Sequence, residues 1–231
     1  MDSRSLTHKR VTVFAGHYGS GKTNIAINYA LMLKNVCNKV SLADLDIVNP
    51  YFRAKDSTDI LEKNGIRFIS SPYANSNVDT PALPAEAYSA FEDTEQTAVI
   101  DVGGDDRGAL ALGRYVPYML KENDYEVLLV INKYRYLTSD ASSVIEVMRE
   151  IEDSAKIRFT GIVNNSNLGE ETTAKTVLDS IAYANEVSKI TGLKIKMTTV
   201  KEDICGELSD KVENVQPIKL FVRQSWLREE I

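Results

Sequence analysis

Gly16-His17-Tyr18-Gly19-Ser20-Gly21-Lys22-Thr23 is the most informative stretch of this sequence. It fits the pattern G-x-x-x-x-G-K-[ST] of a phosphate-binding loop, or P-loop, at every fixed position. Glycines let the backbone turn tightly, so that consecutive N–H groups point inward and hold phosphate oxygens. We expect these residues, together with Asn24, to bind the phosphates of a nucleotide. Lys22 would reach the β- and γ-phosphates, and the Thr23 hydroxyl would lie on Mg²⁺.

The segments on either side of this stretch have the pattern that a P-loop requires. Residues 10–15, before it, are mostly β-branched or apolar and predict a buried strand. Residues 23–33, after it, carry Ile27, Ala30 and Leu31 at helical spacing and predict a helix. The positive N-terminal end of that helix would face the phosphates. The alternative is a glycine-rich turn that binds nothing, and the strand–loop–helix context argues against it.

The length and charge of the chain narrow its class. It has 231 residues, enough for one sizeable α/β domain, so we expect a single P-loop domain over residues 1–231. Its formal net charge of -6 disfavours a broad nucleic-acid-binding surface, although a local basic patch stays open. Residues 1–6 lack the apolar core of a signal peptide, and no segment is long and apolar enough to predict a membrane-spanning helix. Cys37 and Cys205 form no C-x-x-C pattern, which indicates a reduced, cytoplasmic protein with buried thiols.

Two carboxylates lie at the end of the second predicted strand, which covers residues 39–44. Asp44 and Asp46 are one residue apart at its carboxyl end, where open α/β sheets bind ligands. The alternation of an extended chain puts both on the same side. One can help to hold the Mg²⁺ hydration shell, and the other can orient the attacking water. The alternative is a solvated strand end followed by a turn at Asn49-Pro50.

Residues 97–104 are the second strong signal. An apolar strand ends in Asp101, as in a Walker B element, whose carboxylate holds Mg²⁺, usually through water. Gly103 and Gly104 follow and would let the backbone approach the γ-phosphate closely. Such a loop can respond to that phosphate and move when it leaves. The alternative is a buried strand with a turn.

Strands and helices alternate along the whole chain. Further strands are predicted at residues 66–70, 125–132, 156–163 and, as the last strand, 195–200. Further helices are predicted at residues 85–91, at 108–121, where Pro117 should kink or shorten the helix, at 139–151 capped by Ser139 or Asp140, and at about 170–189 ending at Gly192. This alternation predicts an α/β fold, with a doubly wound, mostly parallel sheet flanked by helices.

Two stretches lie outside this alternation of strands and helices. Residues 71–84 contain three prolines and little periodicity, so they predict a long loop, of a kind that often binds ligands or partners. The C-terminal stretch predicts an amphipathic helix. A membrane contact by this helix stays open, but packing on the core is favoured because Glu229 and Glu230 weaken attraction to anionic lipid. The residues that recur there at helical spacing are Ile218, Phe221, Val222 and Trp226.

Taken together, these residues resemble the MinD/ParA group of P-loop ATPases, in the SIMIBI class, over most of the chain. Residues 16–23 look like its P-loop, Asp44-Leu45-Asp46 like its switch I D-x-D, and residues 101–104 like its Walker B and switch II. Gly161-Ile162-Val163-Asn164 looks like the strand whose terminal Asn contacts adenine. Within this group, the P-loop and residues 46–53 together resemble a subgroup of poorly characterised bacterial ParA-like ATPases.

The resemblance implies a function and assigns roles. It implies a Mg²⁺-dependent ATPase that acts as a molecular switch and couples its nucleotide state to an unknown protein partner. Lys22 and Asp46 would be catalytic, with Asp46 positioning water. Thr23, Asp44 and Asp101 would hold Mg²⁺. The nucleotide would contact the P-loop, Gly103, Gly104 and Asn164, and a nucleotide-dependent homodimer is expected to follow from the same likeness.

One departure from the MinD/ParA pattern concerns the dimer. Members of the group usually carry a second lysine early in the P-loop, which reaches across the dimer to the partner's nucleotide. His17 takes its place here, with Tyr18 beside it. Either another cation substitutes, with Arg53 a candidate, or hydrolysis is slow, or the protein acts differently.

The predicted base is adenine, and two further enzyme classes compete with the switch. Asn132-Lys133-Tyr134-Arg135 lacks the final carboxylate that a GTPase of this class uses to bind guanine. The main alternative function is an ATP-dependent biosynthetic ligase or kinase of the same fold, similar to dethiobiotin or cobyrinic acid synthetase. A metal-insertion ATPase is disfavoured because the chain has no paired cysteine motif.

Overall fold

The computed structural model describes residues 8–46, 54–70 and 86–221, and the strands of this part form one eight-stranded sheet. The strand order is β3-β2-β4-β1-β5-β6-β7-β8, and every neighbouring pair is parallel. The predicted parallel, doubly wound sheet is therefore confirmed. The strands are β1 (Val11–Ala15), β2 (Val40–Asp44), β3 (Arg67–Ile69), β4 (Thr97–Asp101), β5 (Tyr125–Ile131), β6 (Gly161–Asn164), β7 (Ile195–Lys201) and β8 (Val215–Ile218).

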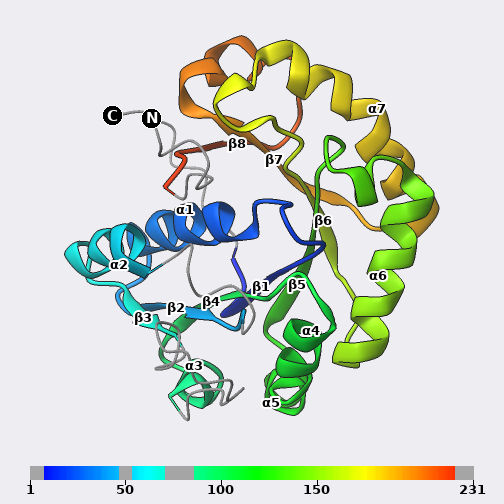
Figure 1. The fold of residues 1–231 in the computed structure, drawn as a ribbon. Coiled ribbons are helices and arrows are strands. Elements are labelled where there is room, and N and C mark those ends of the chain that lie inside the picture. Colours follow the sequence, from blue (N-terminus) through cyan, green and yellow to red (C-terminus); the bar gives the residue numbers. More distant parts are fainter. Residues whose placement is uncertain (1–7, 47–53, 71–85, 222–231) are drawn as a thin grey trace.

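Helices cover both faces of the sheet (Figure 1), as the crossovers between parallel strands require. One face carries α1 (Lys22–Lys34) and α2 (Ala54–Lys63). The opposite face carries α3 (Ala87–Glu92), α4 (Asp106–Gly113), α5 (Val116–Glu122) and α6 (Ala141–Ala155), and α7 (Ala174–Thr191) packs beside α6. Short 3₁₀ turns are η2 (Tyr136–Thr138), η3 (Gly169–Glu171) and η4 (Glu202–Glu207).

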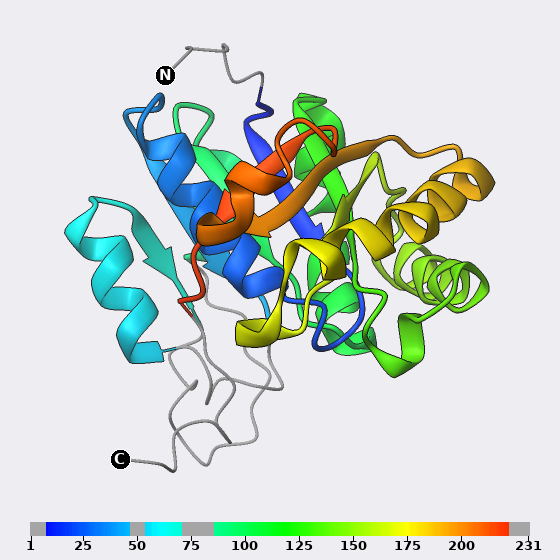
Figure 2. The same cartoon turned by 90° about the horizontal axis from the view of Figure 1, so that it is seen from above.

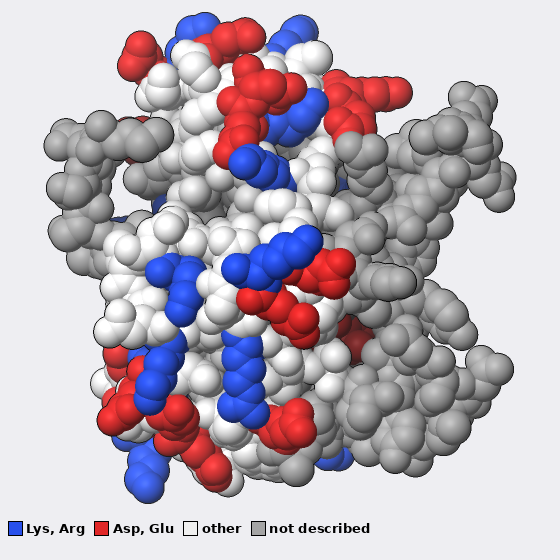
Figure 3. Space-filling model, turned by 90° about the vertical axis from the view of Figure 1, so that its left-hand side faces the viewer, with Lys and Arg blue, Asp and Glu red and all other residues white. Residues whose placement is uncertain are grey.

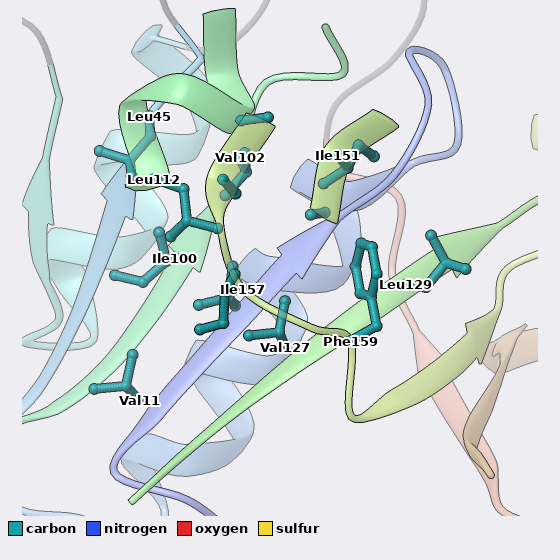
Figure 4. Packing of buried hydrophobic residues seen from close by; sticks show 14 of the residues in the cluster. Val11, Leu45, Ile100, Val102, Leu112, Val127, Leu129, Ile151, Ile157 and Phe159 are labelled. Carbon is teal, nitrogen blue, oxygen red and sulfur yellow. The ribbon is translucent and has the colours of Figure 1, made fainter. Parts of the chain in front are cut away.

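The apolar residues of the central strands are buried on both faces. Along β5, Val127 and Leu129 join the cluster under α4 and α6, whereas Leu128 and Val130 join the cluster under α1. Figure 4 shows the first cluster from close by, with Val127 in the same layer as Ile157. Successive side chains of a strand point to opposite faces, so a strand covered on both faces needs a continuous apolar run. This explains why β5 is apolar almost throughout.

The helix predicted at residues 108–121 is two helices. α4 ends at Gly113 and α5 begins at Val116, with Pro117 in the first turn of α5. A proline lacks the N–H that a helix interior needs, but the first turn has no partner for that group in any case. Pro117 therefore starts a new helix and does not kink a longer one.

The chain after β7 differs from the sequence prediction. Residues 215–218 form strand β8, paired parallel with β7, so the strand at residues 195–200 is not the last and Ile218 is not helical. Pro217 is compatible with β8 because this is an edge strand. Beyond β8 the chain lies beside α1 (Figure 2), where the Asn28 side chain bonds both the N–H and the carbonyl of Lys219 at 2.9 and 2.8 Å. Phe221 is described and is not helical either. Residues 71–84, Arg53, Val222 and Trp226 lie outside the described residues.

Two predicted helix ends are confirmed. The Asp140 carboxylate caps α6 by accepting a hydrogen bond from the Ser143 N–H at 3.0 Å. Gly192 ends α7 with a φ of +74°, a conformation that favours glycine. The strand predicted from residue 156 begins only at Gly161, because Lys156 adopts a left-handed φ of +58° and ends α6.

The surface of the described residues adds three observations. Cys37 and Cys205 are free thiols that are only half-buried, so the prediction of buried thiols is wrong.

Within the described residues, no helix has both the length and the apolar character needed to cross a bilayer. The side of the molecule that carries α2 mixes Lys and Arg with Asp and Glu (Figure 3), so the described part of this side presents no extended surface of one sign.

Candidate functional site

The P-loop joins the carboxyl end of β1 to the first turn of α1. Gly16, Gly19 and Gly21 have φ values of +148°, +75° and +89°, which residues with side chains rarely adopt. A Cβ at Gly16 would also lie 2.5 Å from the carbonyl oxygen of Val130 in β5. Backbone conformation and lack of space therefore both require glycine at the start of the loop.

The N-terminus of α1 is open. Gly21 is its N-cap, its first turn contains no acidic residue, and no side chain in the described part of the protein caps it. The side chains of Asp105, Asp140 and Thr173 cap α4, α6 and α7, whereas the short helices α3 and α5, like α1, have no side-chain cap in that part of the protein. The first N–H groups of a helix lack intrahelical partners and carry partial positive charge. The start of α1 is therefore suited to bind the phosphate groups of an anion.

Lys22 is folded against the loop. Its ammonium group donates a hydrogen bond of 3.0 Å to the carbonyl oxygen of His17, which also accepts from the Ser20 N–H at 3.2 Å. Lys22 is only 5% exposed, and a buried ammonium group needs such oxygen partners. The His17 ring instead bonds the carbonyl oxygen of Tyr18 at 2.9 Å. The charge of Lys22 is thus held within the loop, next to the open end of α1.

The structure brings the three predicted metal ligands together. The Thr23 hydroxyl donates a hydrogen bond of 2.7 Å to the carboxylate of Asp101, which is 2% exposed. Asp44 and Asp101 are direct partners across the β2–β4 pair. All three line one small pocket, and a hydroxyl with two carboxylates fits Mg²⁺, which prefers oxygen ligands. The other walls of this pocket are Ile27, Leu42, Leu61 and Phe68.

Asp46 belongs to the loop that follows β2 and lies next to the loop that follows β4. Its N–H donates to the Asp44 carboxylate at 2.9 Å, and Asp46 is 8% exposed. A Cβ at Gly103 would approach Cγ of Asp46 to 3.2 Å. A Cβ at Gly104 would lie 2.4 Å from the amide nitrogen of Tyr18 in the P-loop. The loop after β4 therefore packs against both Asp46 and the P-loop, so closely that only glycine fits at Gly104.

Asn164 and Asn24 make contacts that differ from those expected of ligand-binding side chains. Asn164 is completely buried: its amide donates to the Ser180 hydroxyl at 3.0 Å, and its side-chain oxygen accepts from the Ser166 hydroxyl at 2.7 Å. The predicted contact with adenine has no support in this geometry and stays a prediction. Asn24 turns its side-chain oxygen to the chain after β8 and accepts from the Phe221 N–H at 2.8 Å.

Two residues outside the predicted set contact the P-loop directly. Arg135 Nε donates to the carbonyl oxygen of Gly19 at 2.9 Å, and Asn165 Nδ2 donates to the carbonyl oxygen of Ser20 at 2.6 Å. Arg135 follows β5 and Asn165 follows β6. The signal that identifies them is a hydrogen-bonding side chain just after the carboxyl end of a parallel strand, at the edge where such sheets bind ligands.

The tetrapeptide Asn132-Lys133-Tyr134-Arg135 leads from β5 to the Gly19 contact. The Lys133 ammonium group donates to the carbonyl oxygen of Asp179 in α7 at 2.7 Å, so it is directed away from the P-loop contact that Arg135 makes. The fourth position, which is a carboxylate in a guanine-binding N-K-x-D pattern, is the guanidinium of Arg135. This stretch therefore places a cation, and not an anion, against the P-loop.

Comparison with known proteins identifies the fold. No protein-family model matches the sequence, and no curated protein matches it. Solved structures do match. FtsY from Mycoplasma mycoides is 22% identical, with a TM-score of 0.52 over 86% of this chain and 62% of that chain. The cell division protein FtsY from Thermotoga maritima is 23% identical, with a TM-score of 0.53 over 91% of this chain and 65% of that chain.

A third match is the signal recognition particle 54 kDa protein from Aeropyrum pernix, solved in complex with GDP. It is 20% identical, with a TM-score of 0.51 over 84% of this chain and 42% of that chain. This chain spans less than two thirds of the length of both FtsY structures. At such identities the likeness establishes the fold, and the narrower likeness to the MinD/ParA group is not confirmed by these structures. The eight-stranded parallel sheet flanked by helices is the fold that this chain shares with them.

Proposed function

We propose that this chain is a Mg²⁺-dependent ATPase that acts as a nucleotide-controlled switch. The observation that carries the proposal is the open N-terminus of α1 beside the contact between Thr23 and Asp101. The helix end suits phosphate, and the hydroxyl and carboxylate suit Mg²⁺. Phosphate groups and metal would therefore bind side by side, as the hydrolysis of a nucleoside triphosphate requires.

The roles of the residues follow from their chemistry. The backbone of residues 16–24 would bind the phosphates, and Lys22 would neutralise charge on them. Thr23, Asp44 and Asp101 would hold Mg²⁺, which when bound supplies positive charge at the β- and γ-phosphates. Asp46, packed against the loop after β4, would orient the attacking water.

ATP is our choice of nucleotide because of the residue at position 135. Guanine recognition uses a carboxylate that accepts hydrogen bonds from the base, whereas the Arg135 guanidinium has only donors. Adenine needs no such carboxylate. The A. pernix protein was solved with GDP, so the base is the point at which we expect this chain to differ from it.

The loop after β4 is the element that we expect to respond to the nucleotide. Gly104 lies against Tyr18 with no room for a side chain, and Gly103 lies close to Asp46, so the arrival or loss of a γ-phosphate would disturb these contacts. A change in this loop can alter a binding surface for a protein partner or for a second copy of the chain. Because His17 stands where the MinD/ParA group has its second lysine, we expect any nucleotide-dependent dimer of this chain to form without a lysine that reaches the partner's nucleotide.

Titration calorimetry tests the proposal. Wild-type protein should bind Mg-ATP at least roughly tenfold more tightly than Mg-GTP, because of the carboxylate missing at position 135. Lys22→Ala should weaken Mg-ATP binding by roughly 100-fold, because a charge-assisted contact to phosphate is lost. Lys175→Ala, which removes an ammonium group from an exposed ion pair on α7, is the control and should bind normally. Unchanged affinity in Lys22→Ala would refute the proposal, and equal affinities for the two nucleotides would refute the choice of ATP.

A second candidate function is the ATP-dependent ligase or kinase. The observation that favours it is the pocket beside Thr23, Asp44 and Asp101, whose other walls are apolar. The pocket has room for only about one water molecule, so this candidate requires the pocket to open before a small carboxylic acid can bind near the γ-phosphate. Strong stimulation of ATP turnover by a small carboxylic acid would support this candidate over the switch, and turnover that no such acid changes would count against it.

A further inference from the structure

Two successive carbonyl groups on the P-loop are bound by side chains from distant parts of the chain. The Gly19 carbonyl accepts from Arg135 at 2.9 Å, and the Ser20 carbonyl accepts from Asn165 at 2.6 Å. Arg135 belongs to the loop after β5 and Asn165 to the loop after β6. The direction of two adjacent peptide groups of the loop is therefore determined from outside it.

The Asn165 side chain is itself held in one orientation. Its Oδ1 accepts a hydrogen bond of 2.5 Å from the Thr199 hydroxyl in β7. Asn165 and Thr199 are 2% and 4% exposed. On the other side, a Cβ at Gly21 would lie 2.2 Å from Asn165 Nδ2. The amide thus bridges β7 and the P-loop, in a space that exists only because residue 21 is glycine.

The consequence for ligand binding follows from the geometry of the peptide group. In a trans peptide the carbonyl and the next N–H point in opposite directions. The bond from Asn165 to the Ser20 carbonyl therefore directs the Gly21 N–H the other way, at the open end of α1. The bond from Arg135 fixes the preceding peptide, whose Ser20 N–H donates to the His17 carbonyl that also accepts from Lys22.

We propose that Asn165 and Arg135 are positioning residues, which fix the backbone of the P-loop before the nucleotide arrives. Asn165 directs the Gly21 N–H toward the phosphate site, and Arg135 fixes the peptide whose N–H holds the His17 carbonyl beside Lys22. Without these bonds the glycine-rich loop would sample other backbone conformations, since glycine allows many. The loop would then have to become ordered each time a nucleotide binds, and the free energy of this ordering would lower the affinity. Thr199 acts one step further away, through Asn165. The inference rests on the proposed nucleotide-binding function.

Calorimetric titration of variants with Mg-ATP is the test. Asn165→Ala should weaken binding about tenfold, as expected for one buried hydrogen bond that organises a site. Arg135→Met, which keeps the aliphatic stem and removes the donor, should weaken it by a similar factor. Thr199→Val should weaken it less. The Asn165→Ala/Thr199→Val double variant should bind as Asn165→Ala does, because Thr199 acts through Asn165.

Gln96→Ala is the matched control. It removes a buried amide whose Nε2 donates to the Ser41 hydroxyl at 2.8 Å, next to the amino end of β4 and so at the opposite edge of the sheet. It should reduce the urea midpoint about as much as Asn165→Ala does and leave Mg-ATP affinity unchanged. Equal weakening in both variants would mean that general destabilisation explains the effect, and the inference would be overturned.

The inference and the proposed function fail in different ways. Wild-type protein that binds Mg-ATP together with an Asn165→Ala variant that binds it equally well would overturn the inference alone. Wild-type protein that binds no nucleotide would overturn the proposed function, and the inference with it.

Discussion

The Asp46 carboxylate lies so close to Gly103 that a Cβ added at Gly103 would come within 3.2 Å of its Cγ. Replacing it (Asp46→Ala) should leave Mg-ATP affinity within about threefold of wild type, because it removes no phosphate or metal contact that we assign. Turnover should fall by roughly 100-fold, a usual contribution of a group that activates or positions water. Phosphate release at saturating Mg-ATP measures this. Asp59→Ala, an exposed aspartate on α2, is the control and should turn over normally; wild-type turnover in Asp46→Ala would remove Asp46 from the mechanism.

At the scale of helices and strands, the Arg10 side chain links the start of β1 to the helices α3 and α5 through hydrogen bonds and an ion pair. It is 8% exposed, donates to the carbonyl oxygens of Ala90 and Phe91 in α3, and forms an ion pair with Glu122 at the end of α5. Arg10→Met should lower the free energy of unfolding by about 3 kcal/mol, because several buried acceptors lose their donor. Urea denaturation measures this. Lys9→Met, which breaks an exposed ion pair, should change it by less than about 0.5 kcal/mol, and equal effects would contradict the role of Arg10.

The cap of α6 makes the stability of this element depend on pH. Hydrogen bonds from Ser142 and Ser143 lower the pKa of the Asp140 carboxyl from 3.8 to about 2. Because the folded-state pKa is the lower one, the cap stabilises fully above about pH 4, and this stabilisation is lost as the pH falls toward about 2. The gap in urea midpoint between wild type and Asp140→Ala should therefore narrow between about pH 5 and pH 2. A gap that stays constant over that range would contradict the assignment.

For the whole molecule, the proposed switch predicts a change of assembly. Light scattering on Asp46→Ala, in which ATP persists, should give twice the chain mass of 25.7 kDa with Mg-ATP and the single mass with Mg-ADP. Both results together support a nucleotide-dependent dimer that does not need the second lysine. The same mass in both nucleotides would contradict the dimer and favour the small-molecule enzyme.

Much of the fold could be predicted because its signals are local. Gly16, Gly19 and Gly21 mark positions where the backbone itself needs glycine, and the buried strands read as apolar runs. Asp140 and Gly192 mark helix ends through bonds to residues within a few positions. Pro117 predicted a kink or a shortening of one helix at residues 108–121, whereas the structure has two helices, with Pro117 in the first turn of the second.

Tertiary structure alone decided the contacts that shape the candidate site. Arg135 and Asn165 are 116 and 145 residues from the P-loop carbonyls that they bind, and no spacing rule links positions so far apart. For Asn164, two neighbouring buried hydroxyls determine its orientation, so the motif could not show which of two adjacent asparagines reaches the loop. β8 likewise depends on an open edge of β7 to pair with. Backbone conformation and phosphate-binding chemistry are properties of neighbouring residues and can be read along the chain, whereas hydrogen bonds between loops exist only once the parallel sheet has brought its carboxyl ends together.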